Sequence, residues 1–209
     1  MRKGCIILLI FYCGATSGLY GQVIRINNGV SITSLSLKDD SKFNLLDSYI
    51  TPYHVSLGID YIEERLWNLS TEIGYMGIGG KGDFRQNSPE ERVTIIKEKG
   101  EYIRFATTVR VKTSRKYQSA YVGIGPSLNL LIGADKFKHE GLSDYRINKC
   151  LYGVKSEVGI NSHLTDKLYA GINVAYIYHL NEFARSGFNR FNSQVFTATL
   201  TVGMELNLK

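Results

Sequence analysis

The stretch FTATLTVGMELNL, residues 196–208, alternates strictly between two kinds of side chain. Apolar residues occupy every second position from Phe196 to Leu208, and Thr, Gly, Glu and Asn stand between them. Because successive side chains of a strand point to opposite faces, this pattern predicts a strand with one wholly apolar face. A strand of a soluble domain usually has about five or six residues, whereas a tilted strand that crosses a bilayer needs about 9 to 11. The thirteen residues of this stretch therefore predict a strand of a membrane barrel.

Seven upstream segments repeat the alternation. They lie within residues 23–37 and at 53–62, 67–75, 103–111, 120–130, 152–160 and 168–179. In the first segment the apolar phase changes between Ile32 and Leu35, which predicts a bulge or a late start. In the fifth, Pro126 removes one donor from the ladder and predicts a bulge or a local bend.

The connections alternate in length. Those after the first, third, fifth and seventh strands are long, and those after the second, fourth and sixth are short. This rhythm predicts an all-β fold, an eight-stranded antiparallel up-and-down transmembrane β-barrel with four long extracellular loops and tight periplasmic turns. In the second long connection, Ser88-Pro89-Glu90-Glu91 is a capping box that predicts a short helix over about 89–99, while the β-branched run from Val93 to Ile96 favours an extension of the next strand instead.

Alternation alone does not say which face is outside, because a soluble barrel that carries a ligand also alternates. The charges decide in favour of lipid outside: all charged residues of the later strands lie on the polar face, and these are Asp60, Glu72, Arg104, Arg110, Lys155, Glu157 and Glu205. Many glycines share this face, as the cramped interior of an eight-stranded barrel requires. Buried charges must be paired, so we expect a lumen charge network that plugs the barrel.

Aromatic residues on the apolar face gather at the two ends of the strands. Tyr53, Tyr75, Tyr152, Tyr176, Tyr178 and Phe196 fall at the long-loop end, and Tyr61 and Trp67 fall at the tight-turn end. Two such groups predict aromatic girdles at the two membrane interfaces.

The N-terminus has the pattern of a secretory signal. Arg2 and Lys3 precede an apolar run at 6–12 and a region of small residues that ends at Gly21. We therefore expect a signal peptide over 1–21 and a barrel domain over 22–209. That domain keeps Cys150 as its single cysteine, so no internal disulfide is expected.

The signal, the rhythm of strands and the closing strand at 196–208 together resemble the small bacterial outer-membrane β-barrel domain family, the group of OmpX-like and PorT-like barrels. The resemblance covers the chain from about Gln22 to Lys209. It implies location in the bacterial outer membrane, outer-membrane lipid and the barrel-assembly machinery as partners, and no particular ligand.

Motifs that could carry chemistry are weak. Gly77, Gly79 and Gly82 match G-x-G-x-x-G but lack the strand and helix context of a dinucleotide site. The four histidines have no metal-like spacing, and His179 has no serine or acid tied to it by sequence. We expect no catalytic residue, no cofactor and no metal. The net charge of +6 comes without a basic, aromatic-rich run, so no nucleic-acid partner is expected.

The function that the sequence predicts is a monomeric outer-membrane barrel, not an enzyme, whose loops serve binding of an extracellular ligand, adhesion or envelope structure. Two alternatives stay open. One is an outer-membrane enzyme that modifies lipid, and the other is a secreted soluble barrel that carries a small apolar ligand.

Overall fold

A computed structural model describes residues 22–37, 48–64, 66–85, 93–114, 118–134, 146–186 and 189–206. The expected signal segment, 1–21, lies outside these ranges, as do parts of the long connections. The chain forms strands β1 Gln22–Leu37, β2 Tyr53–Glu63, β3 Trp67–Arg85, β4 Val93–Ser114, β5 Gln118–Ala134, β6 Arg146–Ile147, β7 Cys150–His163, β8 Leu168–His179, β9 Ala184–Ser186 and β10 Asn189–Leu206. No helix in these ranges is long and apolar enough to cross a membrane.

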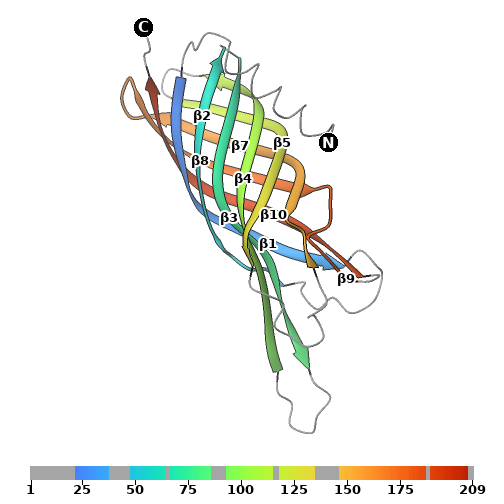
Figure 1. The fold of residues 1–209 in the computed structure, drawn as a ribbon. Coiled ribbons are helices and arrows are strands. Elements are labelled where there is room, and N and C mark those ends of the chain that lie inside the picture. Colours follow the sequence, from blue (N-terminus) through green and yellow to red (C-terminus); the bar gives the residue numbers. More distant parts are fainter. Residues whose placement is uncertain are drawn as a thin grey trace, which may run out of the picture.

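Eight of these strands close into a ring in the order β1-β2-β3-β4-β5-β7-β8-β10, and every pairing is antiparallel (Figure 1). The ring closes where β10 pairs with β1, from Gln22 opposite Leu206 to Leu37 opposite Phe191. The short strands β9 and β6 extend the sheet beside β10 at one rim. The predicted eight-stranded antiparallel barrel is thus confirmed, and it has no free edge within the ring.

The outer surface of the ring is apolar. Large exposed hydrophobic side chains come from all eight strands, and they include Ile26, Leu57, Ile73, Val109, Val122, Ile124, Val158, Ile160, Ile172, Leu200 and Val202. An apolar surface that surrounds the whole barrel is far larger than the patches that soluble monomers expose. It is the surface that a transmembrane barrel presents to lipid.

The bulge or late start predicted for β1 is wrong, because the strand begins at Gln22. Its register with β10 and with β2 runs without a shift. The apolar phase changes for another reason: Ile32 stands opposite the outward-facing Phe196, whereas Leu35 is buried inside the barrel. The interior itself becomes apolar at this end.

Pro126 causes a smaller disturbance than predicted. The β4–β5 ladder lacks pairs opposite Thr107 and Thr108, but the register is the same on both sides of the gap. The proline therefore removes ladder bonds without inserting a bulge. The shifts in the ring lie elsewhere, at Asp60/Ile62 in β2 and at Glu101/Tyr102 in β4.

The second long connection is mostly strand. Residues 79–85 of β3 and 93–99 of β4 pair with each other beyond the last pairs with β2 and β5, and they project from the ring as a two-stranded β3–β4 arm (Figure 1). Of the two predictions for 93–99, the strand extension is confirmed and the helix is wrong, because the β-branched run pairs with β3. The capping-box residues 88–91 lie outside the described ranges.

The exposed hydrophobic side chains around the barrel form an apolar belt, and a first prediction concerns this belt. Val158 is 50% exposed and stands in the middle of β7, paired with Val122 and Val174. Val158→Arg should lower the free energy of unfolding by about 2 to 4 kcal/mol, the cost of arginine at the bilayer midplane. Tyr178→Arg, near the interface, should cost about 0 to 1 kcal/mol. Denaturant titrations in lipid vesicles measure both, and equal costs would contradict a lipid-facing belt.

Candidate functional site

The interior of the barrel holds a closed ring of buried ion pairs. Its members come from β1, β2, β3, β4 and β7, and all point inward: Arg25, Asp60, Glu72, Arg104, Arg110, Lys155 and Glu157. We refer to these seven residues as the lumen ion network. Four cations face three carboxylates, so the network carries one excess positive charge.

Glu72 is the centre of one half of the network. One of its oxygens, Oε1, lies 2.7 Å from Arg104 Nη2 and 2.6 Å from Lys155 Nζ. The other oxygen lies 3.6 Å from Arg25 Nη2. The Arg104 Nη2 nitrogen also lies 3.0 Å from His54 Nε2, so a histidine extends this half towards β2.

Glu157 is the centre of the other half. Its oxygens accept from Arg110 Nε at 2.6 Å and from Lys155 Nζ at 2.8 Å. The Thr108 hydroxyl and the Asn173 amide donate to the same carboxylate at 2.8 and 3.1 Å. A buried carboxylate that accepts four bonds is fully satisfied, which is the condition for tolerating its burial.

Asp60 closes the ring between the two halves. It lies 2.6 Å from Arg25 Nη1 and 3.5 Å from Arg110 Nη1. The chain of contacts therefore returns to its start through Asp60, Arg25, Glu72, Lys155, Glu157 and Arg110.

The structure brings together six of the seven charged residues that the sequence analysis assigned to the lumen. Glu205 is the exception: it is partly exposed, forms no ion pair within the described ranges, and lines a cavity of about 80 Å³ at the tight-turn end with Tyr121 and Tyr169. Arg25 is the member that the analysis missed. The sequence signal that could have identified it is its single charge between Ile24 and Ile26. The alternation in this segment did not settle which of its side chains point inward.

Glycines make room for these side chains. A Cβ at Gly58 would lie 2.8 Å from Arg25 Nε, and a Cβ at Gly159 would collide with the Tyr121 ring. The Arg110 guanidinium lies 4.6 Å from the centre of the same ring. These two glycines thus occupy places where a longer side chain from a neighbouring strand crosses the lumen.

Beyond the network, at the end that carries the β3–β4 arm, the interior holds a cluster of buried apolar side chains. We refer to this group as the outer apolar cluster; its buried members are Leu35, Met76, Ile78, Tyr102, Leu151, Ile177, Phe183, Ala184, Phe191 and Val195. They come from six strands of the ring, from β9 and from the β8–β9 link. Most of these residues lie outside the predicted strands or out of phase with the predicted polar face, so the sequence did not predict an apolar layer in the lumen.

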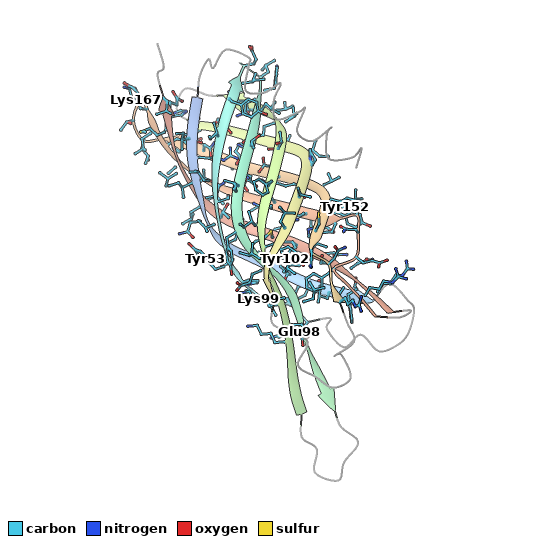
Figure 2. The ribbon with its side chains drawn as sticks, in the orientation of Figure 1. Tyr53, Glu98, Lys99, Tyr102, Tyr152 and Lys167 are labelled. Atoms are coloured by element: carbon cyan, nitrogen blue, oxygen red, sulfur yellow. The ribbon has the colours of Figure 1, made fainter. Side chains whose placement is uncertain are left out.

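The predicted girdle residues lie on the outer face. Tyr53, Tyr152, Tyr176, Tyr178, Phe196 and Trp67 are exposed, whereas Tyr61 and Tyr75 are partly buried. In Figure 2, Tyr53 and Tyr152 lie towards the arm end and Lys167 lies at the opposite end.

One arrangement resembles catalytic machinery and was not foreseen. Ser193 Oγ lies 2.8 Å from His179 Nδ1, and Asn129 Nδ2 lies 2.9 Å from His179 Nε2. The exposed fractions of Ser193, His179 and Asn129 are only 2%, 4% and 0%. All three face the lumen, so lipid at the outer face cannot reach the hydroxyl, and we interpret the trio as a buried polar cluster. Within the described ranges, no group of His, Cys, Asp and Glu is arranged to hold a metal ion.

Solved structures of known proteins share this architecture. The outer membrane protein OprG from Pseudomonas aeruginosa aligns with a TM-score of 0.58 and 13% identity over 89% of this chain and 96% of its own. Neisserial surface protein A aligns with 0.55 and 10% over 90% and 99%, and the outer membrane protease OmpT from Escherichia coli with 0.50 and 8% over 90% and 98%. No family model matches the chain, and no curated protein matches its sequence.

These likenesses show the fold. The chain has the architecture of small outer-membrane β-barrels, and its apolar belt is the surface that such a barrel turns to lipid. It is an integral outer-membrane β-barrel.

A second prediction concerns the network. Glu72→Gln removes the carboxylate shared by Arg25, Arg104 and Lys155. Because it leaves buried charge uncompensated, it should lower the free energy of unfolding by about 3 to 5 kcal/mol. Glu205→Gln, outside the network, should change it by no more than about 0.5 kcal/mol. Denaturant titrations in vesicles compare the two, and a Glu72→Gln variant as stable as Glu205→Gln would contradict the role of the network.

In the same titrations, Lys155→Met on the Glu72→Gln background serves as a further check. It removes one of the uncompensated cations, so part of the lost stability should return. If the double variant loses more free energy of unfolding than the two single variants together, Lys155 acts mainly through Glu157.

Proposed function

We propose that this protein is a non-conducting, non-enzymatic barrel of the outer membrane that anchors the β3–β4 arm at the cell surface for binding. The lumen ion network and the outer apolar cluster support the first half of the proposal, that the barrel does not conduct. They fill the interior in two successive layers, one charged and one apolar. An eight-stranded barrel leaves an interior only wide enough for side chains, so no continuous water path remains for ions.

The rigid base of the arm supports the second half. Thr33 in β1 donates to the Gly79 carbonyl at 2.8 Å and accepts from the Gly79 amide at 3.0 Å. Ser48 exchanges two backbone bonds of 3.0 Å with Lys81, and Ile50 exchanges two with Thr33. Residues 48–50 therefore tie the arm to β1. A strand pair that is held in place at its base presents a surface without the entropy cost of ordering a loop.

The alternatives have less support. An enzyme that modifies lipid needs a nucleophile at the lipid interface, and the Ser193 hydroxyl is buried in the lumen. A soluble carrier would not expose a continuous apolar belt. The fold itself does not decide between binding and catalysis, since one of its structural neighbours is named a protease.

Planar-bilayer recording tests the closed lumen. The purified barrel, shown to be folded by its heat-dependent gel mobility, should give no stable stepwise conductance because side chains fill its interior. Glu72→Gln should stay closed as well, since the outer apolar cluster is intact in that variant. Stable, large open-channel steps from the wild-type protein would overturn the proposal.

Epitope insertion tests the exposure of the arm. A peptide tag inserted between Arg85 and Val93, at the end of the arm, should be labelled by antibody on intact cells. The matched control is the same tag in the β7–β8 turn at Asp166, which should be labelled only after the outer membrane is permeabilised. Labelling of the turn tag alone on intact cells would invert the orientation.

A further inference from the structure

Three lysines gather on one face at the base of the β3–β4 arm. Lys81 in β3 stands directly opposite Lys97 in β4, and Lys99 stands opposite Gly79, two residues nearer the barrel. Together with residues 49–52 they line a cleft of about 230 Å³. We refer to Lys81, Lys97 and Lys99 as the outer lysine cluster.

The cluster faces the lipid side of the barrel. Side chains alternate along β4, so Lys97, Lys99 and Glu101 share the outward phase of Ile103. Glu98 and Tyr102, between them, are buried on the other face. The lysines therefore lie above the apolar belt, on the same outer surface.

A direct contact ties the cluster to the aromatic girdle. The Tyr75 hydroxyl, in the girdle, is close enough to Glu101 and Lys99 to interact with both electrostatically, and Lys99 Nζ lies 2.9 Å from Glu101 Oε1. In Figure 2, Tyr53, another girdle residue, and Lys99 are both at the end of the ring from which the arm extends. Since such girdles lie at the interface, Lys99 is at the height of the lipid head groups.

The outer lysine cluster has less negative charge beside it than its own positive charge. Like charges directly opposite each other on a strand pair are destabilising, yet Lys81 and Lys97 occupy such a pair. Neither forms a salt bridge with any residue that the structure describes, and Glu101 is held by Lys99. That hydrogen bond lowers the pKa of the Glu101 carboxyl and raises the pKa of the Lys99 ammonium, so both stay charged at neutral pH. Among the side chains that the structure describes at this place, the cluster thus keeps three cations against one anion.

From this arrangement we propose that the outer lysine cluster binds the phosphate groups of outer-leaflet lipid. The cleft beside Tyr49 accepts the head group, and the ammonium groups of Lys81 and Lys97 neutralise its phosphate. The acyl chains of the same lipid lie along the apolar belt below Tyr53 and Tyr75. The site rests on the proposed orientation, with the arm at the cell surface, but it does not depend on the closed lumen or on a ligand for the arm.

The test measures retention of a phosphorylated lipid. The full barrel is placed in phosphatidylcholine nanodiscs that contain increasing amounts of diphosphoryl lipid A, and native mass spectrometry counts the lipid A that stays bound. The variant Lys81→Gln, Lys97→Gln, Lys99→Gln keeps the polar side chains and removes the charge. Each lysine near an anionic surface raises the affinity about fivefold, or by about 1 kcal/mol. The triple variant should therefore need at least about tenfold more lipid A to reach the same number of bound molecules.

The matched control is Lys167→Gln, an exposed lysine at the opposite end of the barrel (Figure 2). It should retain lipid A as the wild-type protein does. Heat-dependent gel mobility confirms that each variant is folded. The result of this test does not depend on whether the lumen conducts ions. Equal retention by the triple variant and by Lys167→Gln would overturn the proposal.

Two further arms identify the source of the phosphate. Lipid A without its phosphates should be retained weakly by the wild-type protein. The triple variant should retain it equally weakly. Inorganic phosphate at millimolar concentration, and a soluble sulfated polysaccharide, should each fail to displace diphosphoryl lipid A. Displacement by either one would assign the cluster to a soluble anion and overturn its assignment to lipid.

Discussion

The ladder between β1 and β10 is the interaction on which the rest of the structure depends. In hydrocarbon an unpaired backbone group costs several kcal/mol, and only a closed ring leaves none on the lipid side. The sixteen residues of β1 all pair with β10, which joins the first and last strands of the chain. Closure fixes the inward and outward face of every strand at once, because side chains alternate along each of them.

Closure also sets the problem of the interior. A ring of eight strands confines its inward side chains to a narrow lumen, where each charge loses its water. The chain solves this with carboxylates that are each shared by several cations, as Glu72 is by Arg104 and Lys155. It places glycine where a long side chain must cross, as at Gly58 beneath Arg25. The charged middle layer and the apolar layer around Tyr102 are two different ways of excluding water.

The two ends of the barrel differ in the same physical terms. At the tight-turn end the interior opens to a small polar cavity that includes Glu205. At the other end β3 and β4 continue beyond the ring, where neither β2 nor β5 accompanies them, and residues 48–50 support them instead. The arm is thus an extension of the barrel wall. Its outer face changes from apolar to basic as it leaves the belt.

The sequence by itself determined the barrel, its strands, the lipid-facing side and six members of the lumen network, because period-2 alternation and the sorting of charge and glycine are local patterns. It did not determine that Arg25 joins the network, since that depends on the register between β1 and β2. It also misjudged the phase change at Leu35, whose inward direction follows only from an unshifted ladder. The arm and the pairing of Lys81 with Lys97 were decided by tertiary structure as well, because cross-strand neighbours are set by long-range pairing.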